Sequence, residues 1–124
     1  MNDDVLAVYL TFPDEASAER VARALVDRRL AACVNVVPGA RSVYRWQGAV
    51  QVDPEVLAVA KTQAARLPAL TAAVQALHPY EVPCVVAYPA LGGLEGYLDW
   101  VRSEATGPEP AGGDGQRAPD PPES

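Results

Sequence analysis

The first thirty residues show two different spacings of hydrophobic side chains. Residues 5–12 form an almost continuous apolar and β-branched run, which is typical of a strand buried on both faces. Past Pro13 the apolar residues recur every three or four positions, which predicts a helix over residues 14–30. Acidic residues open this segment and two arginines close it, as the dipole of a helix favours. The pattern therefore predicts a strand followed by a helix.

A valine-rich stretch over residues 32–37 begins the next pair of predicted strands. The chain kinks at the Pro-Gly pair that follows and continues in extended form to a hairpin turn marked by Gly48. It returns through an extended segment over residues 49–62, which we expect to be interrupted at the Asp53-Pro54 pair. These segments predict a β-hairpin.

A second helix, a last strand over residues 82–88 and a short third helix complete the pattern. The apolar stripe of the second helix consists of Leu70, Ala73, Val74 and Leu77, and that of the third of Leu94, Tyr97, Leu98 and Val101. The order β-α-β-β-α-β predicts an α+β, ferredoxin-like fold, in which two helices cover one face of a four-stranded antiparallel sheet and a short C-terminal helix follows.

Three predicted strands are apolar on both sides rather than alternating. They are residues 5–10, 56–60 and 84–88. Two helices cover one sheet face, and a short third helix is too small to cover the other. We therefore expect the second face to pack against other subunits.

Composition and charge narrow the class of protein. The chain has 124 residues, of which 49% are hydrophobic, and this fits one domain. After Thr106 the sequence becomes rich in proline and glycine, so we expect a domain over residues 1–106 and a disordered tail over residues 107–124. The net charge of -6 argues against a surface that binds nucleic acid.

The first residues of the chain and its cysteines indicate the cellular compartment in which we expect the protein. The first residues have the wrong charge for a secretion signal, and the apolar run that follows is too short to cross a membrane. We therefore expect a cytoplasmic protein with no membrane contact. Cys33 and Cys84 lie far apart without a CxxC pair, so they predict neither a disulfide framework nor a thiolate zinc site.

The segment from His78 to Pro83 is the most distinctive part of the sequence, and it holds the only histidine. Pro79 ends the preceding helix, and the two prolines restrict the backbone around Tyr80 and Glu81. A stiff loop of this kind can position ligands. The alternative interpretation is that His78 caps the end of the helix and the prolines only shape a connection.

Residues 5 to 103 taken together resemble the CutA divalent-cation tolerance family, whose members are related in fold to the P-II signalling trimers. The residues that carry this resemblance are Thr11, Pro13, Asp14 and Ala18, the run from Leu30 to Asn35, Ser42, Tyr44, Trp46, Gly48, Lys61, Thr62, the run from His78 to Glu81, Pro83, Tyr97 and Trp100. The resemblance implies a homotrimer and a non-enzymatic role in tolerance of divalent metals, copper in particular.

The resemblance also implies metal ligands at Cys33 and His78, because thiolate and imidazole suit copper or zinc. In the predicted topology these two residues lie at opposite ends of the sheet, so one metal in one subunit cannot contact both. We expect His78 and Glu81 to form an open nitrogen and oxygen site, completed by Asp14 or by a neighbouring subunit. Some family members carry a cysteine where this chain has Leu10, and this difference lowers the expected affinity for thiophilic metals.

Lys61 is the only lysine, and two interpretations of it remain open. In the first, its aliphatic stem packs against apolar side chains and its amine reaches water. In the second, its amine contacts an anion between subunits, by analogy with P-II proteins. The second interpretation would make the protein a trimeric sensor of a small anionic ligand. Trp46 and Trp100 are predicted to serve packing and interfaces, and Tyr80 is held in the histidine loop. A hydrolase would need a nucleophile and base pair, which the sequence does not offer.

Overall fold

The computed structural model describes residues 4–107. The predicted tail beyond residue 107 lies outside the described residues. The elements in chain order are β1 (Val5–Phe12), α1 (Glu15–Asp27), β2 (Cys33–Trp46), β3 (Ala49–Gln63), a 3-10 turn η1 (Ala64–Arg66), α2 (Leu67–Leu77), β4 (Val85–Pro89) and α3 (Glu95–Glu104).

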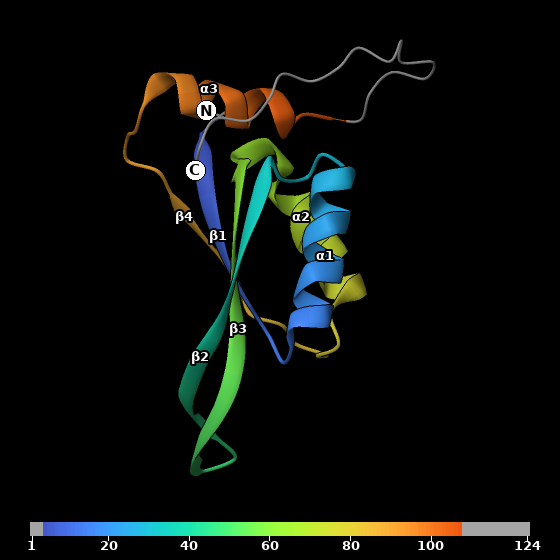
Figure 1. Ribbon diagram of the computed structural model, residues 1–124, viewed down its shortest axis with the longest axis vertical. Coiled ribbons are helices and arrows are strands. Elements are labelled where there is room, and N and C mark those ends of the chain that lie inside the picture. Colours follow the sequence, from blue (N-terminus) through green and yellow to red (C-terminus); the bar gives the residue numbers. More distant parts are fainter. Residues whose placement is uncertain (1–3, 108–124) are drawn as a thin grey trace.

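The four strands form one antiparallel sheet in the order β2-β3-β1-β4. Helices α1 and α2 lie on the same face of this sheet, and α3 crosses one end of the molecule (Figure 1). The α+β class, the four-stranded antiparallel sheet and the three helices are thus as predicted.

Helix α1 begins and ends at recognisable signals. The carboxylate of Asp14 accepts the backbone N–H of Ser17 at 2.7 Å and caps the first turn. The helix ends at Asp27, three residues before the predicted end at Leu30. Arg29 has a left-handed backbone with φ 59°, and the N–H of Leu30 returns to the carbonyl of Leu25 at 2.8 Å, so the chain turns toward the sheet early.

The β2–β3 hairpin confirms the turn predicted at Gly48, where Gln47 and Gly48 both have positive φ. The expected interruption at Asp53-Pro54 is wrong, because β3 is continuous and Pro54 pairs with Arg41. Strand β1 reaches only as far as Val56, so residue 54 has no strand on its other side and lies at a sheet edge, where a proline is tolerated.

The predicted kink after residue 37 is a bulge, since the register shifts between Val37 and Ala40 and Gly39 has φ +92°. Beyond it the hairpin extends past the body of the molecule (Figure 1). We call residues 40–55 the arm.

The main core lies between the sheet and helices α1 and α2. Its fully buried side chains come from alternate positions of β1 and β3 and from the inner faces of the helices, and they include Val8, Leu10, Phe12, Val21, Leu25, Ala58, Ala60, Leu70 and Val74. Strand β4 begins at Val85 and not at the predicted residue 82. Val82 is 86% exposed, and the two residues that follow it precede the first pair of the β1–β4 ladder, Leu10 with Val85.

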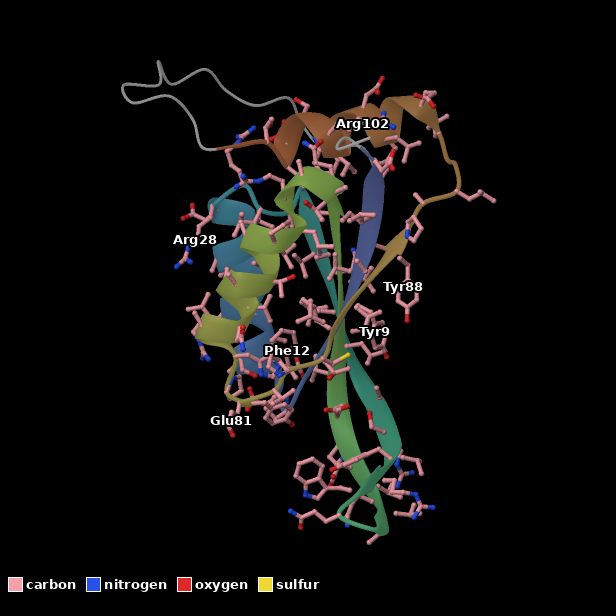
Figure 2. All side chains as sticks on the ribbon, turned by 180° about the vertical axis from the view of Figure 1, so that it is seen from behind. Tyr9, Phe12, Arg28, Glu81, Tyr88 and Arg102 are labelled. Carbon is pink, nitrogen blue, oxygen red and sulfur yellow. The ribbon has the colours of Figure 1, made fainter. Side chains whose placement is uncertain are left out.

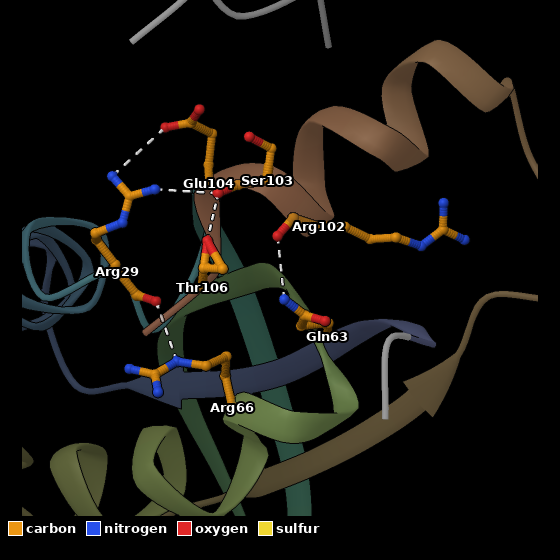
Figure 3. Close-up of polar contacts among 7 residues, drawn as sticks. All are labelled: Arg29, Gln63, Arg66, Arg102, Ser103, Glu104 and Thr106. Atoms are coloured by element: carbon orange, nitrogen blue, oxygen red, sulfur yellow. Dashed lines mark hydrogen bonds and ion pairs between the residues drawn. The ribbon is translucent and has the colours of Figure 1, made fainter. Parts of the chain in front are cut away.

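The other face of the sheet is covered only at one end. There α3 packs a second cluster built on Val5, Ala32, Val101 and Ala105. Polar contacts hold its last turn. Gln63 donates to the carbonyl of Arg102 and Arg29 to that of Ser103 (Figure 3), and Gln63 also donates to the carbonyl of Ala105.

The rest of this second face carries paired side chains from all four strands. We call it the open face, and its members away from α3 include Tyr9, Asn35, Val37, Leu57, Val59 and Val86. Tyr9 and Tyr88 project from this side of β1 and β4 (Figure 2). In the single chain Val86 is 44% and Tyr88 56% exposed.

Candidate functional site

His78 follows the last turn of α2 and lies against the end of β1. Its backbone is extended, as a following proline requires, and its N–H still bonds the carbonyl of Val74 at 2.8 Å. The side chain turns away from the helix. Its Nε2 lies 2.7 Å from the carbonyl oxygen of Thr11, and its Nδ1 accepts the backbone N–H of Tyr80 at 3.0 Å.

Two aromatic rings enclose the imidazole of His78. Phe12 stacks on it at 4.6 Å with an interplanar angle of 18°, and Tyr80 lies at 4.9 Å with its ring tilted by 45°. His78 is 7% exposed as a result. His78 thus contacts both Thr11 and Tyr80.

The side chain of His78 contacts Thr11, Phe12 and Tyr80, and neither Glu81 nor Asp14 is among these partners. Glu81 is exposed on the outer side of the loop (Figure 2). Asp14 is exposed and caps α1, and the backbone N–H of Ser17 holds the pKa of its carboxyl below the ordinary value.

Cys33 lies in a different row of the sheet. It pairs with Lys61, which in turn pairs with Ala7, whereas His78 bonds Thr11 four residues further along β1. Four strand residues span roughly 13 Å, which is too far for one metal ion to contact both side chains. The register therefore agrees with the argument that one subunit cannot hold a metal between Cys33 and His78.

Cys33, Lys61 and Tyr97 form a small group under α3. The Cys33 sulfur is 3.5 Å from the Tyr97 hydroxyl, and the Lys61 ammonium lies 5.4 Å from the centre of the Tyr97 ring. Burial, and then the contact with Cys33, raises the pKa of Tyr97 above its ordinary value. The stem of Lys61 is half-buried, as the packing interpretation expects.

The four predicted ligands do not assemble into a metal site within one chain. Among residues 4–107 no three side chains of the types His, Cys, Asp and Glu come together in a way that could hold a metal ion. His78 in particular has no free lone pair in its ring plane. The arrangement fits a metal only if a second subunit supplies ligands, and that stays a prediction.

Sequence reasoning missed a polar group at the root of the arm. Ser42 donates to the carboxylate of Glu55, and Tyr44 donates to that of Asp53. The bond to Asp53 raises the pKa of the Tyr44 phenol. A signal was present, because a two-residue turn at Gly48 fixes the register and sets Ser42 opposite Asp53.

The two tryptophans have different surroundings. Trp100 is half-buried beside Tyr97 at a ring distance of 5.6 Å, and its indole N–H is buried without a hydrogen-bond partner in the described part of the chain. Trp46 is 61% exposed near the tip of the arm. The packing role predicted for Trp100 is observed, and an interface role for Trp46 stays a prediction.

Comparison with known proteins identifies the family. The family model described as CutA1 divalent ion tolerance protein matches residues 6–104. The "Divalent-cation tolerance protein CutA" of Thermus thermophilus is 53% identical over 100 residues, which are 81% of this chain and 96% of that protein. "Protein CutA" of Homo sapiens is 49% identical over 98 residues, 79% of this chain but only 55% of the human protein.

The solved structures agree with the sequence relatives. The crystal structure of CutA from Xylella fastidiosa superposes with a TM-score of 0.81 and 43% identity, and the match covers 83% of this chain and 99% of that one. Within residues 4–107, no helix has the length and hydrophobicity that a membrane span needs. The match of fold, sequence and family model shows that the chain belongs to the CutA1 divalent ion tolerance protein family.

Proposed function

We propose that this protein is a non-enzymatic homotrimer of ferredoxin-like subunits that binds a divalent cation, copper in the first place, and acts in metal tolerance. Family membership supports the cation, since the relatives are named for divalent-cation tolerance. The observation that carries the assembly is the open face. Its row of Asn35, Val59, Tyr9 and Val86 is largely apolar, and α3 covers only the neighbouring end.

The cation would lie between subunits in this proposal. Of the predicted ligands, Glu81 and Asp14 are exposed and Cys33 is half-buried, so each can be reached from a neighbouring chain. A carboxylate from one subunit and a thiolate from the next would give a mixed site that copper and zinc both accept. No single subunit needs to hold the complete set.

Two measurements test the proposal separately. Light scattering on the purified protein should give the mass of three chains of 13.1 kDa at micromolar concentration. Calorimetric titration with Cu²⁺ and Zn²⁺ should show saturable binding that weakens when Cys33 or Glu81 is replaced by alanine. A mass of one chain would refute the assembly, and titrations without saturable heat would refute the cation.

The surroundings of Lys61 support a second candidate function, the sensing of a small anion. Its ammonium lies over the Tyr97 ring and forms no ion pair with a carboxylate in the described part of the chain. A small anion between subunits would neutralise this charge. Titration with phosphate and with a dicarboxylate, on the wild type and on Lys61→Gln, distinguishes the two candidate functions. Only an anion sensor would bind one of these two anions, and its binding would be lost in the variant.

A further inference from the structure

The two hydrogen bonds of His78 are satisfied together by a single tautomer of its ring. The backbone N–H of Tyr80 can only donate, so Nδ1 must present a lone pair at 3.0 Å. The carbonyl oxygen of Thr11 can only accept, so Nε2 must carry the proton at 2.7 Å. The neutral Nε2–H tautomer satisfies both partners. The imidazolium would lose the Tyr80 bond, and the other neutral tautomer would lose both.

These two bonds also occupy both positions where a metal could bind. A histidine that binds a metal through one nitrogen commonly donates its other N–H to a backbone carbonyl, so the Thr11 bond alone would be compatible with a ligand at Nδ1. The N–H of Tyr80 removes that possibility, because it already uses the Nδ1 lone pair. A metal at Nδ1 would leave this N–H without its partner, and the rings of Phe12 and Tyr80 pack against the imidazole.

His78 also holds Tyr80, whose backbone N–H bonds Nδ1 and whose ring lies 4.9 Å from the imidazole. His78 therefore connects two segments: the end of β1, through Thr11 and Phe12, and the loop, through Tyr80.

We propose that His78 is a positioning residue and that divalent cations bind this protein without it. As the neutral Nε2–H tautomer, His78 holds the loop and Tyr80 against the end of β1. This inference rests on the proposed function only in its second half. It revises the sequence-based prediction that His78 is the principal ligand.

Two variants separate the two hydrogen bonds. In His78→Asn the side-chain oxygen stands close to the position of Nδ1 and keeps an acceptor for the Tyr80 N–H. In His78→Gln the side-chain amide reaches the position of Nε2 and keeps a donor for Thr11. Each is compared with the wild type for circular dichroism, for amide exchange of Tyr80, and for titration with Cu²⁺ and with Zn²⁺.

We expect the ¹⁵N spectrum of this only histidine to show the neutral Nε2–H pattern at pH 7 and to stay unchanged on addition of stoichiometric Zn²⁺. The Tyr80 amide should exchange slowly in the wild type and in His78→Asn, and at least tenfold faster in His78→Gln. Both variants should keep the metal affinities of the wild type within about twofold, because no ligand has been removed.

A shift of the histidine resonances with Zn²⁺, or a tenfold loss of Cu²⁺ affinity in both folded variants, would overturn the proposal. So would a charged or Nδ1–H imidazole at pH 7. If the wild type binds neither metal, the cation half of the proposed function fails, and the tautomer with the Tyr80 exchange pattern still decides whether His78 is the fastening residue.

Discussion

Replacing Gln63 by leucine should loosen α3 without unfolding the rest of the protein. Gln63 is 9% exposed, and its side-chain amide donates to the carbonyl of Arg102 at 3.1 Å (Figure 3) and to that of Ala105 at 2.6 Å, both at the C-terminal end of α3. These carbonyls have no partner within the helix, because the helix ends at Glu104. Leucine has a similar volume and no donor, so the substitution isolates the two hydrogen bonds.

The expected cost is about 2 kcal/mol, since one intramolecular hydrogen bond contributes about 1 kcal/mol net. The main core should not share this loss, because α3 packs on a separate cluster. Opening of α3 should therefore become easier by about 30-fold, the factor that corresponds to 2 kcal/mol. The contact of Arg29 with Ser103 remains and keeps the helix docked.

Amide exchange measures this opening directly. The N–H of Ala105, which bonds the carbonyl of Val101 at 2.9 Å, should exchange about 30-fold faster in Gln63→Leu, while amides in β1 stay protected. Gln75→Leu on the exposed side of α2 is the matched control and should change neither. If Gln63→Leu accelerates Ala105 by less than about threefold, the two bonds do not hold α3 and the reasoning is refuted.

Two further predictions concern the core and the first cap. Leu10→Ala, at a fully buried position between β1 and the helices, should lower the free energy of unfolding by about 2–5 kcal/mol in urea titrations, and a loss under 1 kcal/mol would contradict the packing described. Asp14→Asn should remove a pH-dependent part of the free energy of unfolding. The N–H of Ser17 lowers the pKa of the Asp14 carboxyl in the folded protein, so the carboxylate stabilises the fold fully above its ordinary pKa of 3.8. This stabilisation is lost as the pH falls through the lower pKa of the folded protein. Urea titrations from pH 5 to pH 2 should therefore show the wild type losing more stability than the variant, and parallel curves would refute the role of the cap.

The fold was predictable because its signals are local. Residues 5–12 form β1 with the predicted bounds, and the turn at Gly48 is where the sequence places it. The errors arose where the outcome depends on distant neighbours. The Asp53-Pro54 pair predicts a break, yet β3 continues through it, where β1 has already stopped opposite Val56. The sequence predicts the end of α1 at Leu30, because nothing local shows that Arg29 adopts a left-handed backbone.

The candidate site was less predictable than the fold. The sheet topology places His78 beside Thr11, since the end of β1 and the start of β4 are neighbours in the sheet. The sequence could not show that the N–H of Tyr80 folds back onto Nδ1. That bond depends on the backbone path after Pro79, and it changes His78 from an available ligand into a residue with both nitrogens in use. A histidine motif thus predicts a location better than it predicts a role.

The distribution of polar and apolar side chains across the open face favours contact with another subunit at its centre. Cys33 and Lys61 stand in the row that α3 covers through Tyr97, where their polar atoms find partners. The next row consists of Asn35, Val59, Tyr9 and Val86, and α3 does not cover it. Most of its side-chain surface is apolar and gains little from contact with water. This uncovered row is the observation on which the proposed subunit interface rests, because a partner chain would remove its apolar surface from water.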